Sequence, residues 1–326
     1  RTGQVSAGDR CIIGLDVGST TTKAVIIRED VPYGDSAIAA SVYLRTGGDP
    51  VAAARQCYAS LRDQVPEDID IVGLGVTGSG RQITGLHALT STVVNEIIAH
   101  ARAAAFYDEE VDTIFGIGGQ DAKYTYLTNG VASDYAMNEA CSAGTGSFLE
   151  EAAKESLNIR TEEIGDIAMT GERPTNFSDQ CSAFINSDIK TAIQEGIPIE
   201  DITAGLVYSI CENYTNRVKG ARSVGTKVFM QGGVCYNRAV PAAMAAITGK
   251  EIVVPPEPGL MGAFGIALDV KHKLSLGLAE RRRFDLRTLA EREVRYKKPF
   301  TCRGGKERCD RKCSINLIEI DGKTYP

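Results

Sequence analysis

Two cysteines stand just before stretches with a helical pattern. Cys141 lies at the head of the Gly-rich turn in YAMNEACSAGTGSFLEEAA, residues 135–153, and Cys181 lies in DQCSAFINSDI. The unpaired N–H groups and the dipole at the start of a helix favour negative charge, and therefore suit a thiolate that binds an anionic metal cluster. A [4Fe–4S] cluster is usually held by four Cys thiolates. Two such cysteines per chain predict a cluster that an identical chain completes across a two-fold axis.

A second chemical pattern is an acidic residue at the Gly-containing tip of a hairpin, and it occurs twice. The apolar strand CIIGLDVG (11–18) is followed by the turn GSTTT and the strand KAVIIR (23–28), and GIGGQDAKYTYL repeats this arrangement after the strand 111–117. Such tips present backbone N–H groups and hydroxyls to phosphate, and Asp16 can hold Mg²⁺ through its waters. Two tips that face each other would hold a polyphosphate from both sides. The alternative is that Asp16 and Asp121 only cap their own turns.

Strands, Gly-rich turns and helices alternate along the rest of the chain, which predicts a layered α/β fold. Neither tip matches the P-loop pattern G-x-x-x-x-G-K-[ST]. The predicted helices are 49–64, 90–107, 143–157, 183–195, 202–221, 241–247 and a small-residue helix within 255–268. The further predicted strands are 69–76, 124–127, a strand from the Asn129-Gly130 turn to Met137, 226–230 and 251–255.

Composition and charge limit the class of protein. The chain has 326 residues, of which 43% are hydrophobic and 24% charged, with a net charge of −6 and a pI of about 5.3. These values predict a globular protein of two ordinary domains without a general basic surface for nucleic acid. The apolar runs are too short to span a bilayer and no signal-peptide pattern opens the chain, so we expect a cytoplasmic protein without a membrane partner. Because the first residue is Arg1, we expect an excised piece or a processed form.

The remaining cysteines and the histidines show weaker patterns. Free cysteines are commonly buried as small apolar residues, which remains the alternative for Cys141 and Cys181. The three histidines have no mutual spacing that indicates a site. The cysteines that we expect in the core are Cys11, Cys57, Cys211 and Cys235. The three histidines are His87, His100 and His272.

The C-terminal part of the chain differs in composition from the rest. Residues 279–300 are rich in charge and are predicted to form a solvated helix or linker. The segment CRGGKERCDRKC that follows contains Cys302, Cys309 and Cys313. A metal-binding knuckle is one interpretation, but the spacing matches no strong zinc pattern. We predict that residues 301–326 begin a further, Cys-containing module.

The order of the motifs resembles that of a known ATPase superfamily. DVGSTTTK, GGQDAK, NEACSAGTG, QGGVCYN and MGAFGIAL occur in this order, and they are similar to the phosphate 1, phosphate 2, connecting, adenosine and second connecting motifs of actin, sugar kinases and chaperone ATPases. More narrowly, the chain resembles the ATP-dependent activators of 2-hydroxyacyl-CoA dehydratases and the ATPase subunits of benzoyl-CoA reductase. The resemblance implies a two-domain actin-like (ribonuclease H-like) α/β fold with a nucleotide cleft between the domains. Residues 11–108 with the helix 262–278 would form one domain, and residues 109–261 the other.

The resemblance also assigns site residues. Gln120 and Asp121 of the second phosphate motif are candidates for orienting the water that attacks ATP. Cys141 and Cys181 would be the two cluster ligands that each subunit of a homodimer contributes. The residues expected to bind ATP and Mg²⁺ are Asp16, Gly18, Ser19, Thr20, Thr21, Lys23, Gly118, Gly119, Gly144, Thr145, Gly146, Gly232, Gly233, Asn237 and Gly262.

The function implied by the resemblance is a nucleotide-driven electron gate. ATP hydrolysis would drive a low-potential electron from the shared [4Fe–4S] cluster into an iron–sulfur dehydratase or reductase. An electron donor such as ferredoxin or flavodoxin is also implied. The Cys-containing tail resembles longer fused relatives in which the partner enzyme follows on the same polypeptide. The alternatives are a small-molecule (sugar or acid) kinase without a cluster, and a non-enzymatic ATP-binding module.

Overall fold

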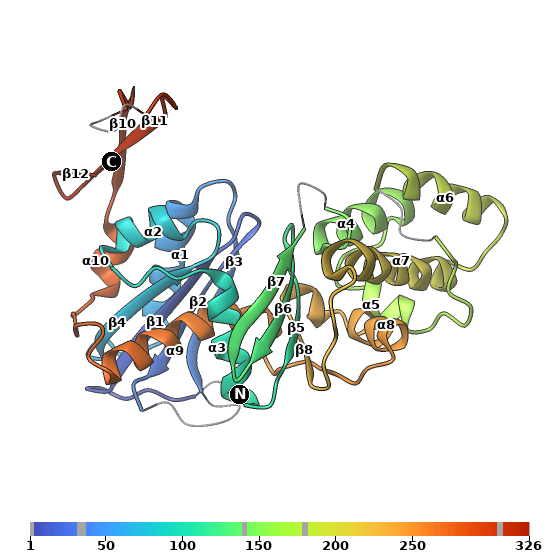
Figure 1. Ribbon diagram of the computed structural model, residues 1–326, viewed down its shortest axis with the longest axis horizontal. Coiled ribbons are helices and arrows are strands. Elements are labelled where there is room, and N and C mark those ends of the chain that lie inside the picture. The colour runs from blue at the N-terminus through green and yellow to red at the C-terminus, as the bar shows by residue number, and fades with distance from the viewer. Residues whose placement is uncertain (1–2, 31–36, 139–141, 178–181, 305–308, 326) are drawn as a thin grey trace.

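The fold consists of two α/β lobes and a small C-terminal sheet. A computed structural model describes residues 3–30, 37–138, 142–177, 182–304 and 309–325 (Figure 1). The two lobes stand side by side, and the C-terminal sheet extends away from the first of them (Figure 1). No described helix combines the length and the apolar character needed to span a bilayer.

The first lobe is built on a four-stranded sheet. Its strands run in the order β3 (Ile38–Arg45), β2 (Thr21–Arg28), β1 (Arg10–Val17) and β4 (Asp70–Thr77). The β1–β2 pair is antiparallel, whereas β1 and β4 are parallel. The central strand β1 is almost wholly buried because α1 (Pro50–Arg62) and α9 (Met261–Ser275) pack in this lobe. Parallel strands buried on both faces carry continuous apolar runs, and CIIGLDV is such a run.

The second lobe is built on a five-stranded sheet with helices beyond it (Figure 1). Its strands run in the order β7 (Val131–Met137), β6 (Ala122–Thr128), β5 (Thr113–Ile117), β8 (Val228–Gln231) and β9 (Ile252–Val253). The helices are α4 (Gly146–Ala152), α5 (Ile164–Ala168), α6 (Ser182–Gln194), α7 (Ile199–Asn213) and α8 (Ala239–Thr248). Phe115, Phe148 and Tyr214 are fully buried at the centre of its core.

Two helices connect the lobes. Helix α3 (Glu96–Tyr107) lies between the two sheets in Figure 1 and packs on α9. The contact is close because Gly265 faces the carbonyl of Ala99, with which any Cβ at this position would collide. The side chain of Asn95 caps the start of α3 by accepting from the N–H of Ile97 at 2.8 Å. The packing fixes the direction in which the first turn of α3 points.

Most predicted elements are present, with three kinds of difference. Strand β3 and the short helices α2 (Arg81–Ala88) and α5 were not predicted. The helix expected from residue 90 begins at Glu96, after the Asn95 cap. The predicted helices 143–157 and 202–221 end in π-helical turns, at Ala153–Leu157 and Tyr214–Lys219.

The C-terminal segment is more structured than a solvated linker. Residues 279–300 contain α10 (Leu286–Glu291) and most of β10 (Val294–Thr301). Leu286 and Leu289 are buried, and Arg55 of α1 donates to the carbonyl of Ala290 at 2.8 Å. The charged residues thus face outward from a helix that packs on the first lobe. Strands β11 (Ser314–Ile320) and β12 (Lys323–Tyr325) complete a three-stranded sheet with β10.

Candidate active site between the two hairpin tips

The two acid-bearing tips meet across a cleft, which we call the tip cleft. One tip joins β1 to β2 and the other joins β5 to β6. They approach so closely that a Cβ at Gly119 would lie 3.0 Å from the side chain of Thr20. The predicted residues that line the cleft are Asp16, Gly18, Ser19, Thr20, Thr21, Lys23, Gly118, Gly119, Gln120, Asp121, Gly232 and Gly233. The sequence-predicted tips therefore face each other, as a polyphosphate site requires.

Asp16 is the enclosed carboxylate of the first tip. It is only 8% exposed and lies 3.5 Å from Nζ of Lys23, its direct cross-strand neighbour. A Cβ at Gly262 would lie 2.6 Å from Oδ2 of Asp16, so this glycine, a predicted nucleotide ligand, leaves the space that the carboxylate occupies. Carboxylate oxygens are preferred ligands of Mg²⁺. The position of Asp16 beneath the tip fits a metal held through water.

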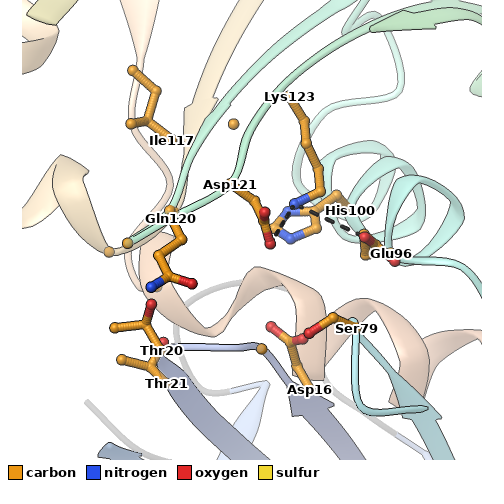
Figure 2. Close-up of a pocket in the computed structure, with 18 of the residues that line it drawn as sticks. Asp16, Thr20, Thr21, Ser79, Glu96, His100, Ile117, Gln120, Asp121 and Lys123 are labelled. Atoms are coloured by element: carbon orange, nitrogen blue, oxygen red, sulfur yellow. Dashed lines mark ion pairs between the residues drawn. The ribbon is translucent and has the colours of Figure 1, made fainter. Parts of the chain in front are cut away.

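The second tip places Gln120 and Asp121 above the first. The N–H of Gly118 donates to the carbonyl of Asp121 at 2.8 Å and closes the turn. The side chain of Asn138 holds the turn from outside, since its Nδ2 donates to the carbonyl of Gln120 at 3.0 Å. In Figure 2 the Gln120 and Asp121 side chains extend into the cleft toward Thr20 and Asp16. This arrangement fits a group that positions water near a phosphate.

Helix α3 contributes two residues that the sequence analysis missed. Glu96 and His100 are one turn apart at the start of α3 and both line the tip cleft. Glu96 lies 3.3 Å from Nη1 of Arg81 and 3.9 Å from Nζ of Lys123, and Lys123 also lies 3.9 Å from Asp121 (Figure 2). The i, i+4 spacing of Glu96 and His100 indicates that both lie on one face of a helix. The sequence does not show that this face is turned toward the two tips.

His100 is a half-buried member of this group. Its Nδ1 lies 2.6 Å from Oε1 of Gln231, which we assign as a hydrogen bond donated by the ring. Burial lowers the pKa of His100 below its ordinary value, and the nearby Asp16 opposes this shift only in part. The spacing of the three histidines gave no indication of a site, and the structure places His100 in the lining of the tip cleft.

The connecting loop supports the second tip from behind. The N–H groups of Gly146 and Ser147 donate to the carbonyls of Gly118 and Gly119 at 2.9 and 2.7 Å. Thr145 is fully buried and its hydroxyl donates to the carbonyl of Ser142. Gly144 and Thr145, predicted nucleotide ligands, are not among the residues that line the tip cleft, and the bonds to the second tip come from Gly146 and Ser147.

A second cavity of about 660 Å³ adjoins the tip cleft. Tyr43 of β3 and Gly146 of α4 lie on its walls, together with Gly233 and Asn237. Oδ1 of Asn237 accepts from the N–H of Ala239, the first residue of α8, at 3.0 Å, while its Nδ2 is buried without a partner among the described residues. A buried donor without a partner is costly. Nδ2 of Asn237 is therefore suited to donate a hydrogen bond to a ligand in the adjoining cavity.

The predicted cluster ligands Cys141 and Cys181 lie outside the described residues. Within the described part of the chain, no three His, Cys, Asp or Glu side chains are arranged to hold a metal ion. The predicted core cysteines are confirmed, because all four are buried, and burial raises the pKa of the Cys57 thiol to about 12. They are Cys11, Cys57, Cys211 and Cys235.

Comparison with known proteins identifies the family. Residues 13–269 match the BadF/BadG/BcrA/BcrD ATPase family. A 2-hydroxyisocaproyl-CoA dehydratase activator of Clostridioides difficile is 35% identical over 78% of this chain and 93% of its own. An (R)-2-hydroxyglutaryl-CoA dehydratase activating ATPase of Acidaminococcus fermentans is 32% identical over 78% of this chain and 95% of its own.

Solved structures agree with the sequence matches. The Clostridium difficile activator with bound ADPNP superposes with a TM-score of 0.74 at 32% identity, covering 83% of this chain and 99% of the other. A Streptomyces griseus glucokinase of the ROK family, with a TM-score of 0.50 at 14% identity, shares the fold alone. The predicted actin-like α/β fold and the predicted family resemblance are confirmed. The chain belongs to the BadF/BadG/BcrA/BcrD ATPase family.

Proposed function

We propose that this chain is an ATP-hydrolysing activator that drives electron transfer to a partner dehydratase or reductase. The observation that carries the proposal is the pair of acid-bearing tips facing each other across one cleft, with Asp16 buried beneath and Asp121 above. The lobes would correspond to the predicted domains, 11–108 with 262–278 and 109–261. The proposed activator function is supported by the relatives named as dehydratase activators and by a solved relative with bound ADPNP.

ATP would extend from the tip cleft into the adjoining cavity. The phosphates would lie between the N–H groups of the tips, where Oγ1 of Thr20 is buried and has no partner among the described residues. The adenosine would lie beside Gly233 and Asn237 of the adjoining cavity and Gly232 of the tip cleft, with Nδ2 of Asn237 as a hydrogen-bond donor. Bound Mg²⁺ would neutralise phosphate charge. Asp16 fits the task of holding it through water, because its carboxylate is fixed by the backbone around it.

Hydrolysis would rely on positioning rather than covalent chemistry. Asp121 or Gln120 would orient the attacking water, since both side chains reach into the cleft. Glu96 is a third candidate, and it also holds Lys123 on the side opposite Asp121. Lys23 and Lys123 place positive charge on either side of the cleft, where negative charge develops as the γ-phosphate is transferred.

The connecting loop would carry the nucleotide state to the cluster. The backbone of Gly146 and Ser147 is bonded to the second tip, and these residues follow Cys141 by a few positions. Any movement of the tip on hydrolysis would therefore displace this segment. We propose that Cys141 and Cys181 of two chains hold one shared [4Fe–4S] cluster in a cytoplasmic homodimer. Ferredoxin or flavodoxin would supply its electron.

Anaerobic purification with iron and sulfide analysis tests the proposal. We expect iron and sulfide in equal amounts in the native chain, and their loss in Cys141→Ser and in Cys181→Ser, because each variant removes a thiolate ligand while changing little volume. The core variant Cys57→Ser is the matched control and should keep its iron. Full iron in either ligand variant would contradict the assignment. A cluster-free protein that phosphorylates a small metabolite would instead support a kinase.

A further inference from the structure

The C-terminal hairpin brings together cysteines that the proposed ATPase site does not use. The last residues paired between β10 and β11 are Thr301 and Ser314, and the N–H of Cys302 donates to the carbonyl of Cys313 at 2.8 Å. Cys302 and Cys313 are therefore direct neighbours across the two chains of the hairpin. Side chains of such neighbours project from the same face, with Cβ atoms about 4.5–5.5 Å apart.

The third cysteine is tied to the same end of the hairpin by a turn at Gly304. The N–H of Gly304 donates to Sγ of Cys302 at 3.4 Å, and its carbonyl accepts from the N–H of Cys309 at 3.2 Å. Gly304 has a φ of +88°, and a Cβ there would collide with the carbonyl of Cys309, so the turn requires glycine. Hydrogen bonds to a sulfur ligand orient it toward a metal. The turn thus fixes Cys302 and holds Cys309 beside it.

Exposure and charge distinguish these thiols from the core cysteines. Cys302 is half-buried, and Cys309 and Cys313 are exposed. Residues 301–313 contain five Lys or Arg and two acidic residues. Positive surroundings favour an anionic thiolate centre, and soft thiolate ligands select zinc over magnesium or calcium.

The outer part of the C-terminal sheet has little core of its own. Every described residue of β10 after Val294 is exposed, including Tyr296 and Phe300. The buried apolar residues of this sheet are Ile318 and Ile320, near its attachment to the first lobe, where Arg292 pairs with Asp321 at 3.0 Å. A sheet this small usually needs a further stabilising element, and a bound metal is one of the common ones.

We propose that Cys302, Cys309 and Cys313 bind a Zn²⁺ ion at the outer end of the β10–β11 hairpin, and that this ion stabilises the outer part of the sheet. Among the described residues, no three His, Cys, Asp or Glu side chains already stand in a metal-binding arrangement. Zn²⁺ binding would therefore bring the sulfur atoms of the three cysteines together, so that binding is coupled to local ordering of the hairpin end. Three thiolates leave one tetrahedral position for a further ligand. The site is separate from the cluster proposed at Cys141 and Cys181.

The test is a Co²⁺ titration of the reduced, metal-free chain, followed by displacement with Zn²⁺. Thiolate ligation gives Co²⁺ an intense sulfur-to-metal charge-transfer absorption, and we expect saturation at about one Co²⁺ per chain. The triple variant Cys302→Ser/Cys309→Ser/Cys313→Ser should lose this absorption. The double variant Cys141→Ser/Cys181→Ser is the matched control and should keep it, which separates this site from the cluster.

Amide hydrogen exchange gives a second readout. Zn²⁺ should slow exchange in β10 and β11 while leaving the two lobes unchanged, and the triple variant should not respond. An absorption that survives in the triple variant, or one that disappears in the double variant, would overturn the proposal. So would a native chain that gives no charge-transfer absorption, or one whose Cys302 and Cys313 are joined by a disulfide in reducing buffer.

Discussion

Asp16 is a buried carboxylate whose movement is restricted by its surroundings. Its oxygens lie beside Gly78 and Gly262, where a Cβ would stand 2.6 Å away, so the side chain has little room to move. Lys23 is its partner at 3.5 Å, and the free face of the carboxylate looks into the tip cleft. A carboxylate held in this way is preorganised for a hydrated metal ion, because little rotational freedom remains to be lost on binding.

The first prediction concerns Asp16→Asn. The change keeps the size of the side chain but removes the charge that orders the waters of Mg²⁺, so we expect Mg²⁺-dependent ATP turnover to fall roughly tenfold or more at limiting Mg²⁺. Steady-state ATPase assays over a range of Mg²⁺ concentrations measure this. Asp63→Asn, on an exposed surface, is the matched control and should leave turnover unchanged. An unchanged rate for Asp16→Asn at limiting Mg²⁺ would exclude the metal role.

The second prediction concerns Glu96→Gln. Loss of the carboxylate removes the charge that holds Lys123 and Arg81, so we expect kcat for ATP hydrolysis to fall about tenfold or more while nucleotide affinity changes little. Turnover assays and equilibrium nucleotide titrations separate the two quantities. Glu151→Gln, on the exposed face of α4, serves as the control. Equal losses of affinity and of kcat would point to a structural role instead.

At the scale of elements, the sequence predicts the helices and strands that have a clear local pattern of residues. The strands beside the tips were found because apolar runs and Gly-rich, acid-bearing turns are adjacent in sequence. Strand β3 was missed because IAASVYLR mixes small and polar residues, and it lies at the edge of its sheet. Helix α2 was missed because it is short, contains Gly85 and lacks a side-chain cap. Local patterns are weakest for such short elements.

The part of the site that is encoded by contiguous stretches was predicted, and the part that depends on long-range contacts was not. Both tips are contiguous stretches, and the structure brings them together. Glu96 and His100 enter the tip cleft only through the packing of α3 on α9, whose residues are separated by more than 150 positions. No local pattern encodes that contact. The local pattern likewise did not show that Gly144 and Gly262, predicted nucleotide ligands, are not among the residues that line the tip cleft.

The third prediction tests the contact between α3 and α9. Gly265→Val places a branched side chain against the carbonyl of Ala99, so the two helices must separate. Overpacking of this kind costs roughly 1–3 kcal/mol of stability. We expect a lower Tm and weaker nucleotide binding, because the first turn of α3 forms part of the wall of the tip cleft and would be displaced. Ala242→Val, at an exposed position of α8, adds the same bulk and should change neither quantity. Wild-type stability of Gly265→Val would show that the helices are not closely packed.

At the scale of the whole molecule, the lobes are joined on both sides of the proposed nucleotide site. Helices α3 and α9 connect them on one side. On the other, Arg45 of β3 pairs with Glu150 of α4 at 3.0 Å, on the wall of the cavity proposed for adenosine. Helix α4 follows the segment that contains Cys141. A change in the distance between the lobes would thus act on both the nucleotide and the region of the proposed cluster.

The last prediction concerns stoichiometry and follows from counting ligands. A [4Fe–4S] cube needs four thiolates, and each chain is proposed to contribute two, Cys141 and Cys181, so the holo protein should be a two-fold dimer with about two irons per chain. Because the shared cluster would bridge the subunits, its removal by chelator or oxygen should weaken the dimer. Analytical ultracentrifugation of holo and apo protein, with iron counted per chain, measures both effects.

The tail provides the control for this measurement. The triple variant Cys302→Ser/Cys309→Ser/Cys313→Ser should keep the dimer and its iron, because these cysteines are not among the proposed ligands of the shared cluster. A monomer with about four irons would contradict the shared cluster, since each chain would then complete a cube by itself. A dimer that survives complete iron removal unchanged would also contradict it, because the cluster would then contribute nothing to association. Loss of both iron and association on oxidation is the outcome that the ligand count requires.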